Sequence, residues 1–173
     1  MPPEEKRRRV FGTPGASLFE ANHLSKMLRQ MGIEGEQRAG VVLENWVEEH
    51  GGYVFHSVKH PTKAFDVDHI LLVGSLMFLV DDKNWSPSYK YTFQEANHGA
   101  TAYRNGVTFP GNEIRSAWQL RTMRALFPGQ KMSAFLNISS PKPTELVGNL
   151  SFPTVSVCQT HILKWLIMNG QAA

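Results

Sequence analysis

The stretch over residues 65–85 constrains the fold of this chain most strongly. It contains two apolar runs, residues 70–73 and 76–80, which are separated only by Gly74 and Ser75. Short apolar runs on either side of small turn-forming residues are typical of two buried strands joined as a β-hairpin. A turn centred on Gly74 and Ser75 predicts the pairing register, in which Ile70 lies opposite Leu79.

The same register places charged residues together at the open end of the hairpin. Asp68 is predicted opposite Asp81, and Asp66 opposite Lys83, with all four side chains on one face because side chains alternate along a strand. Directly opposed like charges destabilise a strand pair. A bound cation would explain them, and magnesium suits the site because it takes only one or two protein carboxylates. The alternative is an Asp66–Lys83 salt bridge with the other aspartates in solvent.

A glutamate in a neighbouring helix is a further candidate for this site. The spacing of Ala39, Leu43 and Trp46 predicts an amphipathic helix over residues 35–49. Glu36 extends its apolar stripe instead of its solvated face. Two explanations remain open. The helix dipole could stabilise the negative charge of Glu36 in the first turn, or Glu36 could point at a metal site on the adjoining sheet.

Composition bounds the remaining possibilities. A chain of 173 residues with 42% hydrophobic content can bury one sizeable core, and its net charge of +3 is compatible with an anionic partner. Cys158 is the single cysteine, which excludes an internal disulfide and a cysteine-rich zinc site. The N-terminus lacks the apolar core of a signal peptide, and the apolar hairpin is too short to span a bilayer. We therefore expect a soluble, cytoplasmic protein without membrane contact.

The remaining pattern divides the chain into three parts. Residues 1–15 are expected to form a flexible basic arm, residues 16–31 an amphipathic helix that ends before Gly32, and residues 32–173 the main domain. Its further predicted helices cover residues 113–127 and 160–168, and its further predicted strands cover residues 53–58, 89–93, 101–103, 107–109, 131–138 and 154–157. The strands over residues 101–103 and 107–109, which flank Asn105-Gly106, are expected to form a second hairpin.

The histidines do not have the spacing of a zinc motif, so no zinc site is expected, and Cys158 is interpreted as a packing residue. His69 is predicted to lie on the sheet face opposite to Asp68.

The order of these features resembles that of the PD-(D/E)xK nuclease superfamily. Within it, the chain is similar to the nuclease-related domain, through Gly35-Glu36, through the sequence DVDH at residues 66–69, and through FLVDDKNW at residues 78–85. The similarity covers about residues 32–165. It implies a mixed α/β fold, with a restriction-endonuclease-like αβββαβ core in which a central mixed sheet is flanked by helices.

The resemblance also implies roles for individual residues. Asp68 and Asp81 would be ligands of Mg²⁺, for which Mn²⁺ could substitute, and the main-chain carbonyl of Asp82 would complete the shell. Lys83 would orient the attacking water, act as its base, or stabilise developing charge, and Glu36 would support the metal. The chain departs from the family at Asp82, where a small or β-branched residue is usual.

A second departure concerns substrate contacts from the helix over residues 113–127. Glu113 and Ser116 replace the family's usual proline and glutamine, which leaves Gln119 as a weaker substitute.

These features predict a magnesium-dependent nuclease that acts on DNA, with RNA as the alternative substrate. Arg115, Gln119, Arg121 and the basic arm would contact the phosphate backbone without reading sequence. The alternative function is a catalytically inactive nuclease-fold module that binds nucleic acid or a protein partner. Retention of Asp68, Asp81 and Lys83 together favours the enzyme. The sequence does not determine the oligomeric state.

Overall fold

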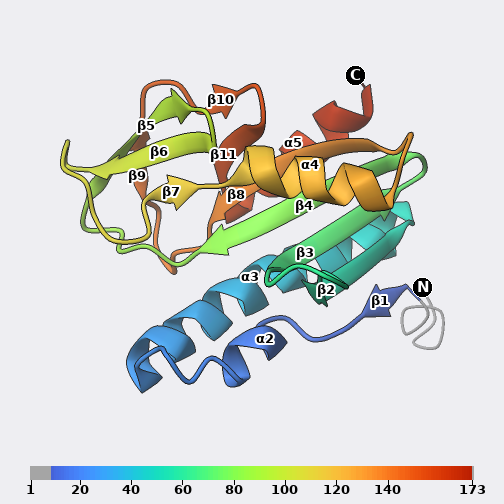
Figure 1. The fold of residues 1–173 in the computed structure, drawn as a ribbon, viewed down its shortest axis with the longest axis horizontal. Helices are drawn as coiled ribbons and strands as arrows, with labels where there is room; N and C mark the ends of the chain where they lie inside the picture. The colour runs from blue at the N-terminus through green and yellow to red at the C-terminus, as the bar shows by residue number, and fades with distance from the viewer. Residues whose placement is uncertain (1–8, 173) are drawn as a thin grey trace.

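The computed structural model describes residues 9–172, and its centre is a seven-stranded mixed sheet (Figure 1). The strand order is β1-β2-β3-β4-β8-β11-β10. Their bounds are Val10–Phe11 for β1, Tyr53–Lys59 for β2, Asp66–Val73 for β3, Leu76–Lys83 for β4, Lys131–Ile138 for β8, Ser151–Phe152 for β10 and Val155–Gln159 for β11.

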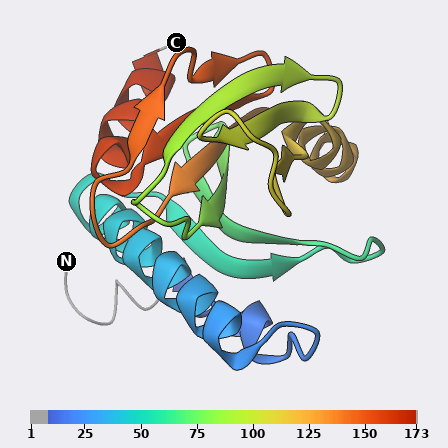
Figure 2. The same cartoon turned by 90° about the vertical axis from the view of Figure 1, so that its left-hand side faces the viewer.

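Helices cover both faces of this sheet. One face carries α3 (Lys26–His50) and α5 (Thr160–Ala172), and the other carries α4 (Ser116–Leu126). A short helix, α2 (Ala16–Phe19), lies beside the first half of α3, and both extend beyond the sheet (Figure 2). The elements α3, β2, β3, β4, α4 and β8 follow one another in the predicted αβββαβ order, and this fold class is confirmed.

A second, four-stranded sheet interrupts that core between β4 and α4. Its order is β7-β6-β5-β9, with bounds Glu113–Ile114, Gly99–Arg104, Lys90–Ala96 and Glu145–Val147. It packs against β8 and β11 through Leu136, Ile138 and Val157. This burial gives the second sheet a hydrophobic cluster that it shares with β8 and β11.

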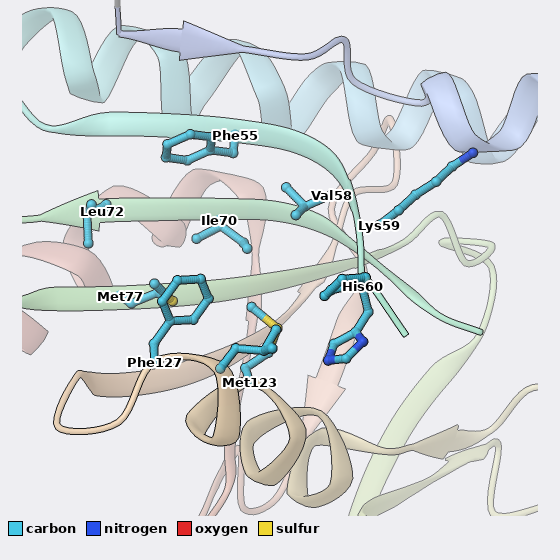
Figure 3. A pocket seen from close by; sticks show the side chains of 11 residues that line it. Phe55, Val58, Lys59, His60, Ile70, Leu72, Met77, Met123 and Phe127 are labelled. Carbon is cyan, nitrogen blue, oxygen red and sulfur yellow. The ribbon is translucent and has the colours of Figure 1, made fainter. Parts of the chain in front are cut away.

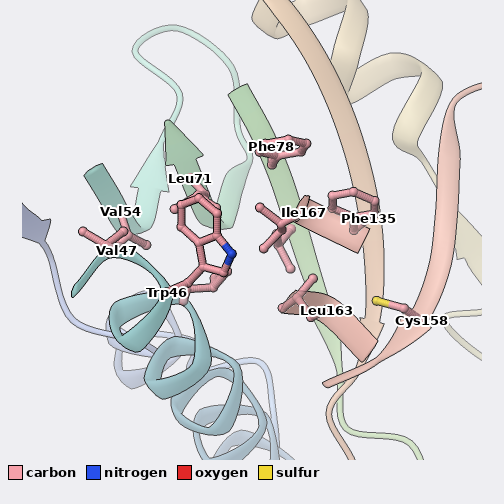
Figure 4. Close-up of a cluster of buried hydrophobic side chains, with 11 residues drawn as sticks. Trp46, Val47, Val54, Leu71, Phe78, Phe135, Cys158, Leu163 and Ile167 are labelled. Carbon is pink, nitrogen blue, oxygen red and sulfur yellow. The ribbon is translucent and has the colours of Figure 1, made fainter. Parts of the chain in front are cut away.

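The central hairpin has the predicted register. Ile70 lies opposite Leu79 in the β3–β4 pair, and β4 then pairs in parallel with β8. Because side chains alternate, Leu71 and Phe78 face α3 and α5, where they belong to one buried cluster with Trp46 (Figure 4). The opposite face of the hairpin packs on Leu120 and Met123 of α4. Burial on both faces explains the continuous apolar runs of this stretch.

The two predicted N-terminal helices are wrong, since α3 is one continuous helix. Its N-cap is Ser25, whose hydroxyl accepts a hydrogen bond from the Leu28 N–H. Gly32 does not end the helix, and Gly35 does not begin one. At Gly35 a Cβ atom would lie 2.6 Å from the Ser139 Oγ and 2.9 Å from the Asn84 Cβ. A glycine is therefore required there by close packing.

The predicted second hairpin is also wrong. Strand β6 pairs with β5 on one side and with β7 on the other, and the Asn105-Gly106 turn closes only a single bridge between Arg104 and Val107. Strand pairing stops there because Asn112 bonds Ala102 instead. The Asn112 carbonyl accepts a hydrogen bond from the Ala102 N–H, and the Asn112 side-chain amide donates to the Ala102 carbonyl. Residues Glu113–Ile114, predicted as helix, accordingly form a strand.

The arm predicted over residues 1–15 is described only from residue 9. Val10–Phe11 forms β1, which pairs in parallel with β2, so this part is joined to the sheet. The other basic residues of the arm, residues 6–8, lie outside the described residues. Within residues 9–172, none of the helices combines the length and the apolar character needed to cross a bilayer.

Candidate active site

The sheet splits at the open end of the central hairpin. Pairing between β3 and β4 runs as far as His69–Val80, whereas β3 continues to pair with β2 as far as Asp66, and β4 with β8 as far as Lys83. Beyond His69, the Asp82 N–H donates to the Asp68 carboxylate at 2.7 Å. A side chain thus bonds the backbone group that the separated strand leaves free.

Three charged groups gather at this split. Burial raises the pKa of Asp68 well above its usual range, and the neighbouring Asp81 and Glu36 raise it further. The Lys83 Nζ lies 3.2 Å from both carboxylate oxygens of Asp81. Asp81, and then Asp68, raise the pKa of Lys83, which therefore remains a charged ammonium. Asp68, Asp81 and Lys83 are neighbours, as the register predicted.

The predicted opposition of Asp66 to Lys83 is wrong. Asp66 lies opposite Lys59 on β2, because β3 stays with β2 after it has left β4. Lys83 forms its ion pair with Asp81. The alternative explanation of the charges, an Asp66–Lys83 salt bridge at a strand end, therefore does not describe this site.

Glu36 reaches the site from the middle of α3. Its side chain is 4% exposed, and it accepts a hydrogen bond of 2.8 Å from the Gly15 N–H. Burial raises the pKa of Glu36 to about 7, against the opposing effects of His69 and of the Gly15 bond. Because α3 begins at Lys26, Glu36 is not in the first turn, and the helix dipole does not explain it.

Polar contacts hold α3 against the end of β4. The Asn84 amide donates to the Met31 carbonyl at 2.6 Å, and the Arg38 Nε donates to the Ser139 carbonyl at 2.6 Å. Ser139 in turn donates its N–H to the Lys83 carbonyl. Together with the close approach at Gly35, these bonds set the position of Glu36 relative to Lys83.

The side chain of Asp82 points away from Asp81 and Lys83, to the other face of β4. It is buried, and its two oxygens contact the His69 Nε2 at 2.5 Å and the Asn137 amide at 2.7 Å. Burial raises the pKa of Asp82, and its bonds to His69 and Asn137 oppose that rise. Because both oxygens are engaged, only the main-chain carbonyl of Asp82 remains as a candidate metal ligand.

The buried polar cluster around Asp82 was not predicted from the sequence. The His69 Nδ1 lies 2.7 Å from the His56 Nδ1, and the His56 Nε2 lies 3.3 Å from a Glu44 oxygen. Burial, followed by His69, lowers the pKa of His56 to about 3. The hairpin register contained a signal for this cluster, because it places His69 and Asp82 diagonally on one sheet face.

The donors at the split suit a hard divalent cation. Within residues 9–172, no three His, Cys, Asp or Glu side chains form a ready-made metal cluster. Magnesium does not require one, since it binds through one or two carboxylates and otherwise through water and phosphate oxygens. The crowding that raises the pKa of Asp68 would be relieved by such an ion. Asp68 and Asp81 therefore fit magnesium.

The three residues proposed for nucleic-acid contact lie on or before α4. Arg115 is exposed and pairs with Glu113 at 3.0 Å, Gln119 is half-buried, and Arg121 is exposed. Trp118 contacts Phe65, with 4.6 Å between the ring centroids, which places the start of α4 beside the start of β3. In the described part of the chain, no hydrogen bond or ion pair links these three side chains to the hairpin carboxylates.

Two of the cavities beside the hairpin concern the carboxylates and the apolar face of β3 and β4. The larger, of about 530 Å³, is an apolar groove between β2–β4 and α4, with Lys59 and His60 at one end (Figure 3). The smaller, of about 260 Å³, lies at the split and is lined by Glu36, Asp68 and Lys83 among other residues. Of these two, the smaller is lined by carboxylates of the split, and we identify it as the candidate active site.

A comparison with known protein families matches the part of the chain that contains the candidate site. A family model described as the nuclease-related domain matches residues 31–138, which is more than half of the chain. The matched segment runs from α3 to the end of β8 and includes every residue of the split. Neither a curated protein nor a solved structure gives a significant match.

Proposed function

The chain belongs to the nuclease-related domain family, and we propose that it is a metal-dependent nuclease that hydrolyses phosphodiester bonds in DNA. The observation that carries the proposal is the split hairpin, where Asp68 and Lys83 line a cavity and Asp81 forms an ion pair with the Lys83 ammonium. These groups are within reach of one another without a partner chain. RNA remains the alternative substrate.

Asp68, Asp81 and the main-chain carbonyl of Asp82 would hold Mg²⁺ or Mn²⁺. When bound, such an ion lowers the pKa of a water ligand and neutralises charge on the phosphate. The chain's own contribution is the fixed geometry: the bond from the Asp82 N–H orients the Asp68 carboxylate, and parallel pairing with β8 positions Asp81.

The pKa shifts of Lys83 and Glu36 indicate different roles for the two side chains in the proposed reaction. The Lys83 ammonium cannot accept a proton, because Asp81 and Asp68 raise its pKa, so it stabilises negative charge on the reacting phosphate. A carboxylate with a pKa of about 7 can accept a proton at neutral pH. Glu36 is therefore the proposed acceptor for the proton of the attacking water.

Arg115, Gln119 and Arg121 would contact the phosphate backbone on the α4 side of the site. The exposed arginine side chains suit such contacts, which position a substrate without reading its sequence. The ion pair between Arg115 and Glu113 is weak enough to be exchanged, because both side chains are largely exposed.

Cleavage assays test the proposal. The purified protein is incubated with supercoiled plasmid, linear duplex, single-stranded DNA and RNA, in Mg²⁺, in Mn²⁺ and in chelator. We expect cleavage of DNA that requires metal and is lost in Asp81→Asn. The matched control, Glu95→Gln, changes an exposed residue of β5 and should keep full activity. Metal-independent cleavage, or full activity of Asp81→Asn, would contradict the proposal, and binding without cleavage would favour the inactive module.

A further inference from the structure

The cavity at the split has two unlike walls. One wall carries Glu36, Asp68 and Lys83 of the candidate site. The other is purely apolar and comes from the chain around α2 and from the first turns of α3; its side chains are Leu18, Leu24, Leu28 and Met31. A substrate whose phosphate reaches Lys83 through this cavity would therefore also lie against these four apolar side chains.

This apolar wall is not part of a hydrophobic core. Leu28 is 51% exposed and Met31 is 36% exposed, and neither belongs to the three buried clusters of the protein. Phe19 and Met27 nearby are also exposed. An apolar patch that stays in water beside a polar site indicates a binding surface for something with an apolar face of its own.

The wall is nevertheless attached firmly to the site. Asn84, which directly follows Lys83, bonds the Met31 carbonyl, and Gly15 bonds Glu36. A Cβ atom at Gly32 would lie only 2.7 Å from Leu18, so α2 packs closely on α3. These contacts keep the apolar wall at a constant place relative to the charged one.

The chemistry of nucleic acids identifies what can fill such a cavity. Phosphate and sugar are polar, and the faces of the bases are the main apolar surface. In a continuous duplex those faces are stacked on neighbouring bases, so only an unpaired or extruded nucleotide can place its base against protein side chains. Leucine and methionine side chains are known to contact unstacked base faces.

We propose that this cavity binds an unpaired nucleotide, with its phosphate at Asp68 and Lys83 and its base against the wall formed by Leu18, Leu24, Leu28 and Met31. The inference rests on the proposed function and adds the substrate class: single strands and unpaired strand ends, in preference to continuous duplex. The larger groove under α4 does not serve this purpose, because no acidic group lines it.

The test compares one sequence as a single strand, as a blunt duplex and as a duplex with a single-stranded flap, at one salt concentration and with Mg²⁺. The wall variant is the double substitution Leu28→Ser with Met31→Ser. Its matched control is Val41→Ser, which changes an exposed aliphatic residue further along the same helix. Thermal unfolding verifies that both variants fold.

We expect the wild-type protein to cleave the single strand and the flap at least about tenfold more efficiently than the duplex. The wall variant should lose about tenfold in kcat/KM on the single strand, mainly through KM, and Val41→Ser should lose nothing. A second readout does not need activity: the inactive Asp81→Asn protein should bind a fluorescent single strand, and adding the wall substitutions to it should weaken this binding by a similar factor.

The outcomes separate this inference from the proposed function. Equal or better cleavage of the duplex, unchanged in the wall variant, overturns the substrate class and leaves the nuclease intact. Single-strand binding that depends on the wall, without cleavage by the wild-type protein in any metal, supports the inference and overturns the nuclease. If the wall substitutions change neither cleavage nor single-strand binding, the inference is overturned, and a protein partner becomes the better explanation of the wall.

Discussion

At the residue scale, the chemistry of Glu36 depends on the burial of its side chain, which lies in the middle of α3. Its carboxylate has lost almost all contact with water, and the Gly15 N–H provides its one hydrogen bond in the described structure. The charged form is therefore disfavoured, which is why the pKa of Glu36 rises from 4.5 to about 7. A residue in this state costs stability when it is ionised and is available as a proton acceptor.

This burial predicts a pH dependence of stability. Between pH 4.5 and about 7 the folded protein binds the Glu36 proton more tightly than the unfolded chain does, so the free energy of unfolding falls as the pH rises through this window. The contribution is at most about 1.4 kcal/mol per pH unit. Glu36→Gln keeps an acceptor for Gly15 and removes the charge. In chelator, the variant should show a smaller loss of stability between pH 5 and pH 8.

Urea unfolding of both proteins at the two pH values measures this difference. Glu95→Gln on β5 is the exposed control and should follow the wild-type protein. A Glu36→Gln variant with the wild-type pH dependence would show that the carboxylate is not destabilised by burial. Its cleavage activity, measured in parallel, should be reduced if Glu36 accepts the proton.

Asp82 gives the second prediction at this scale. The family usually has a small or β-branched residue at this position, so Asp82→Val resembles a return to the family pattern. In this chain, however, valine would leave His69 and Asn137 buried without their shared acceptor. We expect a loss of at least about 1–3 kcal/mol in the free energy of unfolding. Asp82→Asn keeps one acceptor and should lose less, and a stable Asp82→Val protein would contradict the importance of the cluster.

At the element scale, α3 is positioned by the absence of a side chain at Gly35. Replacing glycine by alanine within a helix normally stabilises it by up to about 1 kcal/mol. Here the added methyl group would meet Ser139 and the Asn84 Cβ, and Asn84 belongs to the chain that directly follows Lys83. We therefore expect Gly35→Ala to lose about 1–3 kcal/mol of stability and to lose activity as α3 moves away from the split.

The measurement is urea unfolding together with kcat/KM. The control is Gln37→Ala, which adds a good helix former on the solvent side of α3 and should be neutral or slightly stabilising. A Gly35→Ala protein with wild-type stability and activity would mean that the contact between α3 and β4 is loose.

At the scale of the whole molecule, the split lies between two parts of the sheet. Asp68 belongs to the part made of β1–β3, and Asp81 belongs to the part that continues into β8 and β11. A cation bound by both carboxylates would join the two parts and remove the repulsion between them. Binding to the folded state alone stabilises the whole chain by mass action.

Mg²⁺ should therefore raise the melting temperature of the wild-type protein in proportion to the logarithm of its concentration. Asp81→Asn should show little or no shift, while its melting temperature in chelator stays equal to or above that of the wild-type protein, because a crowded carboxylate has been removed. Differential scanning calorimetry over a Mg²⁺ series measures both effects. A full Mg²⁺ shift in Asp81→Asn would exclude Asp81 as a ligand.

The sequence by itself determined the features that depend on local periodicity. The hairpin register follows from two apolar runs and one turn, and it was sufficient to bring Asp68, Asp81 and Lys83 together. The αβββαβ order follows from the same periodic signals and from the family resemblance. These predictions succeeded because the alternation of side chains between the two faces of a strand is a short-range property of the backbone.

The tertiary structure decided what depends on contacts between distant segments. Gly32 and Gly35 read as helix ends, but α3 continues through them because Leu18, Asn84 and Ser139 pack closely against it. The bonds that join Asp82 to His69 and Asn137 cross three strands, and the apolar wall of the cavity comes from residues 50 or more positions away from Asp81 in the chain. Local patterns do not encode such contacts, because they arise only when the whole chain has folded.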